Sequence, residues 1–396
     1  MVRQLKGCFS MKIAMLCDYP IGDNFQALGL APRPDVLATP VLNLIQGLCR
    51  GAEHQVHVIT FKQGLARNQM VRPRANLTIH YLRAPRFSGL TTLYLTRIIR
   101  LRRLLRRLAP DIVHGQGTEK EMGLAAVTSG WPALITVHGM LFDVVTITRP
   151  GLLAAIWLNV LIERLTLRLA RQVVCISEYS RQHLAARTRA RLHLVPNPVS
   201  DRFFAPADPA VRDVLLFVGN IYMLKGVLEL VDVFESLAAE NPSLKLVIIG
   251  KRFESRSNRQ YLAALDARIQ ASGLADRIHS TGWQDEASIK AWHARACLFI
   301  FPSRLENLPM SIAEALASGV PVIASDVGGI SEMVQPGLNG YLARPEDTAA
   351  FIALARKALE PGENRRLAQS AAVSVERLRI NHVAEATLSV YTQMRA

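Results

Sequence analysis

Apolar residues in the first half of the chain alternate between short continuous runs and longer stretches with helical spacing. A short apolar run bounded by turn residues predicts a buried strand, and apolar residues three and four positions apart predict a helix with one buried face. Repeated alternation of the two predicts a parallel sheet with helices on both faces. The predicted strands are 12–17, 55–61, 77–82, 111–114, 133–138 and 172–177, and the predicted helices are 36–48, 93–108 and 151–170.

The same alternation starts again after a turn-rich segment, which is typical of a linker. That segment contains four prolines, Pro196, Pro198, Pro206 and Pro209. The later predicted strands are 214–219, 244–250, 278–280, 297–301, 320–324 and a short one near Tyr341. We therefore predict two Rossmann-like α/β domains, residues 1–204 and 205–380, and a helix over 381–396 that packs back on the first domain. Ligands of such sheets bind at the carboxyl ends of the strands, so a cleft between the domains is the expected site.

The composition is that of a globular protein. The chain has 396 residues, more than a single domain with one hydrophobic core usually contains. Half of the residues are apolar and a fifth are charged. The five cysteines are scattered without a CxxC pair, which argues against a disulfide framework or a structural zinc and favours the cytosol. No long apolar run follows the basic residues of 1–10, so a secretory signal is not expected. The apolar stretch 151–162 is too short to span a membrane and predicts a buried or half-buried helix.

Two glutamates, Glu306 and Glu314, are separated by seven residues at the end of a predicted strand. Glu306 lies in the loop, and Glu314 lies inside the helix predicted for 310–318. The amides at the start of such a helix favour an anion such as a diphosphate, and a carboxylate accepts hydrogen bonds from two hydroxyls at once. Taken alone, the pair has a second interpretation, in which Glu306 caps the helix and Glu314 is a solvated helix residue.

The surrounding segment 301–340 resembles the signature of the family-4 glycosyltransferases (glycosyl transferases group 1), which have the GT-B fold of two Rossmann-like domains facing each other across a cleft. The resemblance follows the order of the motifs along nearly the whole chain. It implies that Glu306 contacts hydroxyls of a donor sugar and that Glu314 contacts the donor ribose. It also implies that the backbone of Asn307, Leu308 and Pro309 lines the sugar and diphosphate pocket.

A second motif is VGNIYMLKG, residues 218–226, at the end of the first strand of the second domain. Gly219 permits a tight turn, and Lys225 offers a compact cation. The resemblance implies that Lys225 neutralises the donor diphosphate. Many family members have an arginine directly after the glycine, where this chain has Asn220, so binding of the donor diphosphate is either weaker or completed by another basic residue. Without the resemblance, a surface lysine after a strand is the favoured interpretation of Lys225.

Five further positions come from the first domain. His138 ends an apolar strand, and the resemblance implies that it steadies the transition state by a hydrogen bond to the donor sugar; a structural histidine is the alternative. His114 either lines an acceptor pocket or bonds to backbone. Gly22 is the nearest counterpart of the glycine pair that the family places near the donor phosphate. Pro198 replaces a family glycine and excludes a positive φ there, and Asn197 beside it is interpreted as structural.

The charge is concentrated in the first half of the chain. Residues 1–200 contain 26 Lys and Arg against 10 Asp and Glu, whereas residues 201–396 contain 21 against 22. Residues 97–108 hold six arginines, and helical spacing puts most of them opposite an apolar arc. That arc packs on the sheet with the arginines in water, or the helix also meets an anionic membrane surface. Nucleic acid is not expected as a partner, because no motif or aromatic platform accompanies the charge.

These features together predict a retaining glycosyltransferase with a nucleotide-sugar donor and a glycan or lipid-linked acceptor. No cofactor and no metal are expected, since no DxD motif is present. Closure of the domains is expected to bring His138, Lys225 and Glu306 around the sugar. We expect a cytoplasmic protein, peripheral on the inner face of the membrane. A GT-B phosphorylase or epimerase and a catalytically weak binding subunit at the membrane are the alternatives.

Overall fold

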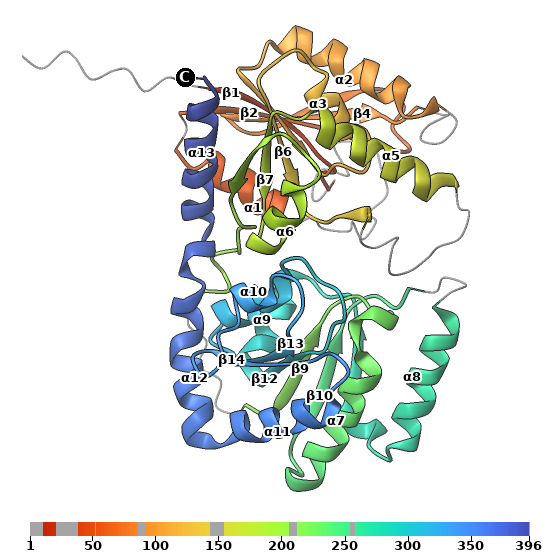
Figure 1. Ribbon diagram of the computed structural model, residues 1–396, viewed down its shortest axis with the longest axis vertical. Coiled ribbons are helices and arrows are strands. Elements are labelled where there is room, and N and C mark those ends of the chain that lie inside the picture. The colour runs from red at the N-terminus through yellow and green to blue at the C-terminus, as the bar shows by residue number, and fades with distance from the viewer. Residues whose placement is uncertain are drawn as a thin grey trace, which may run out of the picture. The chain divides into compact units, whose positions relative to one another are not determined.

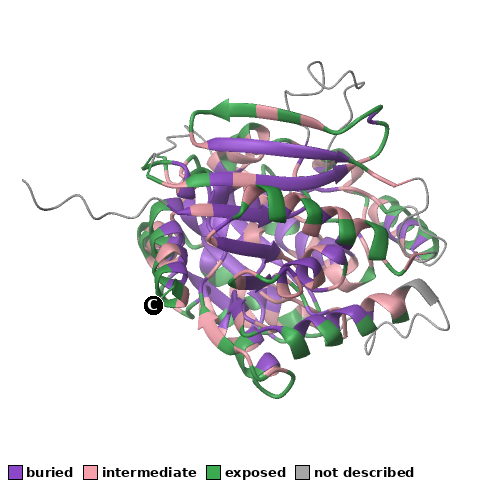
Figure 2. Ribbon diagram, turned by 90° about the horizontal axis from the view of Figure 1, so that it is seen from above, coloured by how far each residue is buried: buried purple, intermediate pink, exposed green. Residues whose placement is uncertain are grey.

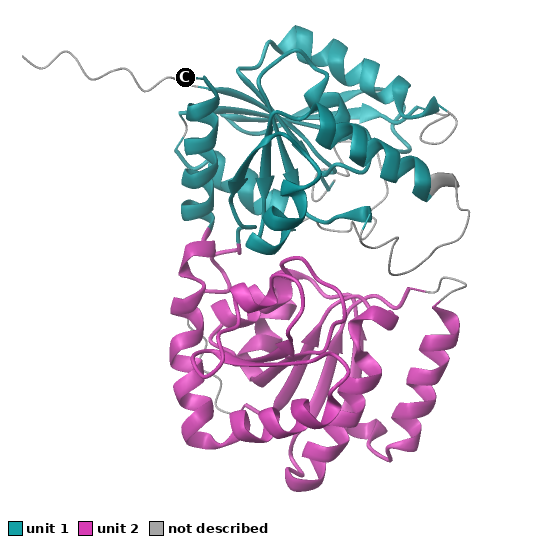
Figure 3. Ribbon diagram, viewed as in Figure 1, with its two compact units in different colours: residues 1–198, 380–396 teal, residues 199–379 magenta. Residues whose placement is uncertain are grey.

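The computed structural model describes residues 11–20, 39–51, 53–85, 92–142, 154–205, 212–253 and 258–395. The chain forms two compact units, shown in teal and magenta in Figure 3. The first unit contains residues 1–198 together with 380–396, and the second contains residues 199–379. Gly22, the predicted counterpart of the phosphate-loop glycines, lies outside the described residues.

The first unit is built on an eight-stranded sheet with the order β3-β4-β2-β1-β5-β6-β7-β8 (Figure 1). All neighbouring strands are parallel except the edge pair β3 and β4, which is antiparallel. The central strands are continuous apolar runs because helices cover both faces, and Figure 2 shows them buried along most of their length. The strands are β1 Lys12–Leu16, β2 Gln55–Lys62, β3 Gln69–Arg74, β4 Leu77–Arg83, β5 Ile112–Gln116, β6 Ala133–Val137, β7 Gln172–Cys175 and β8 Arg191–Leu194.

Helices form a layer on each face of this sheet. On one face, α1 (Thr39–Leu48) and α13 (Ile380–Arg395) pack together and share one hydrophobic cluster with the strands. The other face carries α2 (Leu95–Leu108), α3 (Glu121–Val127), α5 (Ala154–Leu169) and α6 (Glu178–Ala185) over a second cluster. The C-terminal segment therefore belongs to the first unit, through buried residues such as Val383 and Tyr391 of α13.

The second unit has a six-stranded, wholly parallel sheet with the order β11-β10-β9-β12-β13-β14. Numbered within the unit this is the order 3-2-1-4-5-6, in which the direction of winding reverses between β9 and β12. The strands are β9 Val214–Val218, β10 Lys245–Ile249, β11 Ile278–Gly282, β12 Ala296–Phe301, β13 Val322–Ser325 and β14 Gly340–Ala343. The helices are α7 Val227–Glu240, α8 Arg259–Ala271, α9 Glu286–Arg295, α10 Met310–Ala317, α11 Thr348–Leu359 and α12 Pro361–Ser374, with short 3₁₀ turns η3 Met223–Lys225, η4 Ala275–Arg277, η5 Ile330–Glu332 and η6 Glu376–Leu378.

The unit boundary lies after Pro198 rather than after residue 204, where the sequence interpretation put it. The intervening residues are attached to the second unit. The amide of Val199 donates to the carbonyl of Leu378, and the carbonyl of Phe203 accepts from Lys290 and Ser318. Prolines indicated a linker, but these contacts decide to which unit the segment belongs.

Candidate functional site

The most chemically distinctive region of the second unit is the switch point between β9 and β12. These strands are neighbours in the sheet, and the chain leaves them to form the loops 219–226 and 302–309. A backbone contact joins the loops, since the amide of Arg304 donates to the carbonyl of Leu224. The fold therefore holds side by side the two segments that carry Lys225 and Glu306.

Lys225 and Glu306 form an ion pair between these loops. Their side chains are only 14% and 10% exposed, so Lys225 is not the solvated surface lysine of the alternative interpretation. The hydroxyl of Ser303 donates to the same carboxylate oxygen of Glu306, at 2.7 Å. The ammonium group also lies over the rings of Tyr222 and Phe301. A cation and an anion are thus held at fixed positions in a partly dehydrated place, where they interact more strongly than in water.

Two glycines allow the backbone to approach closely at this site. Gly226 has a φ of 67°, and a side chain there would place its Cβ 2.1 Å from the carbonyl oxygen of Pro302. Gly328 has a φ of 58°, and its Cβ would lie 1.9 Å from the carbonyl oxygen of Glu306. Since both positions exclude a Cβ by strain and by contact, only glycine lets the neighbouring turns support the loop that carries Glu306.

Glu314 lies inside α10 and is 8% exposed. Burial raises its pKa to about 8, and the charge of Glu286 adds to the effect. Glu314 is therefore not a solvated helix residue. Glu306 is not the cap of the helix either, because the N-cap of α10 is Pro309 and has no side-chain cap bond. The structure removes both parts of the alternative interpretation of the glutamate pair.

The residues between the two glutamates form the start of α10. Leu308 is buried, and the carbonyl of Asn307 accepts a hydrogen bond of 2.7 Å from the amide of Gly329. Pro309 ends the loop in an extended conformation, and α10 begins at the next residue. The first amides of a helix have no partner inside the helix, so this end of α10 presents hydrogen-bond donors beside the ion pair.

Gly219 and Asn220 directly follow β9. The amide of Gly219 donates to Ile249, and Asn220 is exposed. The next residue, Ile221, is hydrogen-bonded through its amide to the carbonyl of Lys251 after β10. The backbone of the basic residue Lys251 therefore lies beside the loop at Asn220, where the family pattern has an arginine.

In the first unit, His138 directly follows β6 and is half-buried. Its Nε2 lies 2.7 Å from Oε1 of Gln116, which is at the end of the neighbouring strand β5. Burial lowers the pKa of His138, while the charge of Glu119 and a hydrogen bond with Asn197 act in the opposite direction. His138, Gln116 and Asn197 line a small cavity of about 20 Å³.

The Gln116 amide fixes the protonation of both histidines. Its Nε2 is 3.1 Å from the sulfur of Met15, which only accepts, so Oε1 faces His138 and the Nε2 of His138 must carry the proton. The same amide donates to Nε2 of His114 at 3.2 Å. Burial lowers the pKa of His114 to about 3 and keeps it neutral, so its Nδ1 carries the proton and donates to the hydroxyl of Tyr391 at 2.7 Å.

This network corrects the interpretation of His114. The residue is fully buried, so it does not line an acceptor pocket, and its partners are the side chains of Thr136, Gln116 and Tyr391 rather than backbone. Tyr391 is 277 positions away in the sequence. The Tyr391 hydroxyl bonds to His114, and Gln116 bonds to both His114 and His138. This chain of hydrogen bonds connects helix α13 to the carboxyl end of β6.

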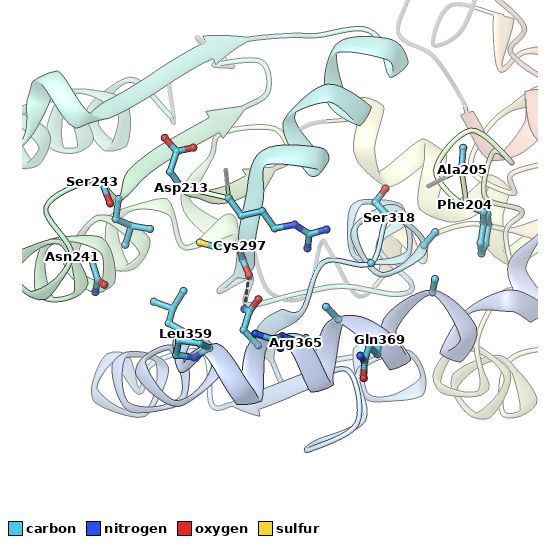
Figure 4. A pocket seen from close by; sticks show the side chains of 18 residues that line it. Phe204, Ala205, Asp213, Asn241, Ser243, Cys297, Ser318, Leu359, Arg365 and Gln369 are labelled. Carbon is cyan, nitrogen blue, oxygen red and sulfur yellow. Dashed lines mark hydrogen bonds between the residues drawn. The ribbon is translucent and has the colours of Figure 1, made fainter. Parts of the chain in front are cut away.

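A cavity in the second unit is separate from this site. It has a volume of about 770 Å³ and is shown in Figure 4. Asp213, Leu244 and Cys297 line it, and they lie at the amino ends of β9, β10 and β12. The switch point with Lys225 and Glu306 is at the opposite ends of these strands, so the cavity takes no part in the chemistry of the switch point. Within the described ranges no cluster of three His, Cys, Asp or Glu has the arrangement of a metal site.

Sequence reasoning missed three side chains that support the predicted ones. Ser303 binds Glu306, Gln116 binds His138, and the buried Glu163 accepts from the amides of Leu141 and Phe142 just beyond His138. Only Ser303 had a usable signal, because it lies three residues before Glu306 in the same loop. Gln116 and Glu163 meet their partners through the fold.

Two family profiles match adjacent parts of the chain. Residues 201–373 match the profile of the glycosyl transferases group 1, and residues 37–203 match that of glycosyltransferase family 4. A D-inositol 3-phosphate glycosyltransferase of Xylanimonas cellulosilytica is 29% identical over 220 residues, 51% of this chain and 51% of that protein. An MMP alpha-(1->4)-mannosyltransferase of Mycolicibacterium hassiacum is 28% identical over 299 residues, 71% of this chain and 70% of that protein. The chain spans about half the length of several curated relatives that it matches.

Solved structures resemble the whole chain. Sucrose-phosphate synthase from Thermosynechococcus elongatus has a TM-score of 0.77 at 19% identity, covering 97% of this chain and 99% of that one. HepE from Anabaena, in complex with UDP and glucose, has a TM-score of 0.70 at 16% identity, covering 96% of this chain and 99% of that one. At these identities the likeness shows the fold, which is GT-B with two parallel-strand α/β domains.

Proposed function

Because the chain belongs to the family-4 glycosyltransferases, we propose that it is a retaining enzyme that transfers a sugar from a nucleotide-sugar donor to a glycan or lipid-linked acceptor. The product class would be a cell-surface polysaccharide or a glycolipid. The observation that carries the proposal is the half-buried Lys225–Glu306 pair at the switch point of the second unit. This is the place where doubly wound sheets bind nucleotides.

Each group at the switch point suits one part of a nucleotide sugar. Lys225 and the first amides of α10 favour the diphosphate, which gains negative charge as the sugar departs. Glu306 accepts hydrogen bonds from sugar hydroxyls, and Glu314 accepts them from the ribose. Lys225 and Glu306 neutralise each other in their ion pair. A bound donor would offer its phosphate to Lys225 and its sugar hydroxyls to Glu306, so each residue would exchange its partner in the ion pair for a group of the donor.

The catalysis we propose is mainly electrostatic. Stabilisation of the leaving diphosphate by Lys225 lowers the barrier to sugar departure, and a hydrogen bond between His138 and the donor sugar steadies the transition state. Retention of configuration is proposed from the family resemblance and fits displacement on the same face of the sugar. No cofactor or metal is part of this proposal, in which a lysine and helix amides supply the positive charge.

The acceptor side is proposed to lie at the cytoplasmic surface of a membrane, as a lipid-linked acceptor requires. Ile98, Leu101 and Leu105 of α2 are buried against the sheet. Arg97 is attached to Glu121, and Arg100 to the carbonyl of Arg83. The remaining arginines of α2 are proposed to meet anionic lipid headgroups, and they are Arg102, Arg103, Arg106 and Arg107. No helix in the described part of the chain combines the length and the apolar character needed to span a bilayer.

A catalytically weak binding subunit is the second candidate. It is favoured by the exposed Asn220, which stands where the family pattern has an arginine. The two candidates differ in turnover, because a binding subunit would hold an acceptor or another transferase without breaking the glycosyl bond of a donor.

Donor binding and donor hydrolysis test the proposal. Purified protein is titrated calorimetrically with UDP-, GDP- and ADP-sugars, and slow hydrolysis of the same donors is followed by release of the nucleoside diphosphate. We expect one base to bind and its donor to be hydrolysed slowly, since water can take the place of an absent acceptor. Binding without hydrolysis or transfer would favour the binding subunit, and neither binding nor hydrolysis with any donor would reject the enzyme.

A further inference from the structure

The outward face of α5 carries large apolar side chains where a surface helix normally carries polar ones. Six residues of this helix are exposed among those whose side chains the structure describes: Trp157, Leu161, Arg164, Leu165, Arg168 and Leu169. Leu161 is 62% exposed, Leu165 41% and Leu169 45%. The leucines follow one another at four-residue intervals and so form a continuous stripe along the helix. The helix is half-buried, as the sequence predicts, but its exposed face is unusually apolar for a surface helix.

The inner face of α5 already accounts for the position of the helix. Val160, Ile162 and Leu167 are buried. The carboxylate of Glu163 accepts hydrogen bonds from the amides of Leu141 and Phe142, at 3.1 and 3.2 Å. Because these contacts suffice to hold α5 on the unit, the exposed leucines are not needed to attach it. A contiguous exposed apolar stripe of this kind marks a surface that binds something.

Helix α2 lies in the same layer as α5. Leu101 and Leu105 of α2 and Leu167 of α5 belong to one hydrophobic cluster on one face of the sheet, and α3 packs against both helices. The hydroxyl of Tyr94, just before α2, donates to Oδ1 of Asn159 in α5 at 3.1 Å. The outer faces of the two helices therefore belong to the same side of the first unit (Figure 1).

We propose that the outer faces of α2 and α5 together form a membrane-binding surface, with the α5 leucines inserting between lipids and the arginines of both helices meeting anionic headgroups. This inference rests on the membrane location in the proposed function and assigns the insertion to a different helix. Apolar side chains flanked by arginines are the features that bind a helix flat in the interface of a bilayer. Charge alone is screened by salt, whereas leucine insertion is not.

The charges on the two helices favour lipid over a second copy of the chain. Helix α2 has no acidic residue, and the single acidic residue of α5, Glu163, is 3% exposed and turned inward. A symmetric dimer through this face would place one basic patch against another, with no exposed acidic residue on either helix to pair with the arginines. An anionic bilayer supplies the opposite charge to the arginines and an apolar interior to the leucines.

The test is flotation of purified protein with vesicles of phosphatidylcholine, with and without phosphatidylglycerol. We expect wild type to float with the anionic vesicles. The double variant Leu161→Ser/Leu165→Ser should lose about tenfold or more of its binding, since each leucine returns from lipid to water. Its matched control is Leu338→Ser/Val373→Ser, which removes two exposed apolar residues of the second unit and should float like wild type.

The charge arm uses Arg103→Glu/Arg106→Glu, with Arg259→Glu/Arg365→Glu of the second unit as the control for net charge. We expect the α2 variant to lose binding and its control to retain it. The two arms should respond differently to salt. Added salt should weaken the binding of wild type to anionic vesicles but should not abolish it. The binding that remains at high salt should be absent in the leucine variant.

Fluorescence gives a second readout on α5. Trp157 is on the exposed side of the helix, so its emission should shift to the blue with anionic vesicles and be quenched by brominated acyl chains, and Trp157→Phe should abolish both changes. Leucine variants that float like wild type, or unchanged Trp157 emission, would overturn the insertion. A dimer in light scattering that the leucine variant converts to monomer, without any loss of flotation, would assign the stripe to a second copy instead.

The inference and the proposed function fail in separable ways. Donor binding and hydrolysis are measured without lipid and depend on the switch point of the second unit. A protein that binds and hydrolyses a donor but never floats keeps the enzyme and loses the membrane surface. A protein that floats through α2 alone keeps the proposed membrane location and loses the role of α5.

Discussion

At the carboxyl ends of the strands, the second unit holds a cation against an anion, whereas the first holds neutral histidines in a network of neutral groups. Lys225 and Glu306 form a half-buried ion pair after β9 and β12. Around β5 and β6, burial lowers the pKa of both His114 and His138, and Gln116 joins them. The same kind of sheet thus offers fixed charge in one unit and a fixed network of neutral hydrogen-bonding groups in the other.

The difference shows how two units with the same architecture can contribute different chemical groups to one reaction. Fixed charges suit a diphosphate whose charge grows in the transition state, and neutral hydrogen-bonding groups suit hydroxyl groups that must be oriented. The fold places loops at the strand ends, but the side chains of each loop decide the chemistry. Changing the charged unit and the neutral unit in turn should show whether the two fail differently.

The largest effect is expected from the ion pair. Glu306→Ala or Lys225→Met should lower kcat by about 10²- to 10³-fold, because each removes a group that acts on the transition state. The double variant should be little worse than either single one, since the two groups work as a unit. Steady-state kinetics with the preferred donor measure kcat, and thermal unfolding shows whether each variant remains folded.

The control for this prediction is Glu240→Gln, which breaks the exposed ion pair of Arg356 and Glu240 in the same unit. It should leave kcat unchanged, because exposed pairs contribute little. Turnover at the wild-type rate in Glu306→Ala would reject the proposed site, and so would a loss of activity that is matched by unfolding of the variant.

The next effect concerns Glu314, whose pKa is raised to about 8 by burial. An acid with a raised folded-state pKa keeps its proton where the unfolded chain has released it, so it destabilises the fold as pH rises from about 4.5 to about 8. Over that range the second unit should lose up to roughly 5 kcal/mol of stability. Urea unfolding at a series of pH values should show this decline in wild type and not in Glu314→Gln.

Donor binding should reverse the shift at Glu314. Ribose hydroxyls that donate to its carboxylate stabilise the ionised form and lower the pKa, so binding at pH 7 should release a proton. The release appears as a dependence of the calorimetric enthalpy on the ionisation enthalpy of the buffer. Glu314→Gln should abolish that dependence, and a wild type whose binding enthalpy is the same in all buffers would contradict the contact with the ribose.

Much of the fold could be predicted from the sequence because its central strands are apolar on both faces. The two missed strands of the first unit lack that signal. β3 is an exposed edge strand that contains Pro73, and β8 is a four-residue edge strand with no buried residue. Both lie at the margins of the sheet, where one side has no partner strand and the residues need not be apolar.

The candidate site was predictable only as far as its residues are close in the sequence. Glu306 and Glu314 share one loop and helix, so their spacing carries information. His114 was misinterpreted because its partner Tyr391 reaches it through the docking of α13, which no local pattern encodes. Gln116 was missed for the same reason, since it meets His138 across neighbouring strands. Sequence patterns indicate which residues end a strand but not which strands are neighbours.

The smallest effect is expected from Gln116, and it tests the neutral half of the comparison. Gln116→Leu should lower kcat about tenfold, because His138 loses the acceptor that keeps its proton on Nε2 and the ring becomes free to reorient. The KM for the donor should change little, since the charged unit is intact. The tautomer of His138, read from its imidazole ¹⁵N shifts, should become mixed. Gln116→Glu restores an acceptor and should recover most of the rate.

The first unit provides a matched control for this change. Gln172 and His193 form a pair with the same atoms and the same distance of 2.7 Å, between β7 and β8. Gln172→Leu removes an equivalent hydrogen bond and should reduce stability by a similar amount while leaving kcat and the His138 tautomer unchanged. If Gln116→Leu and Gln172→Leu had the same effect on all three measurements, the network around His138 would be a structural feature of the sheet, and the proposed division between a charged unit and an orienting unit would lose its second half.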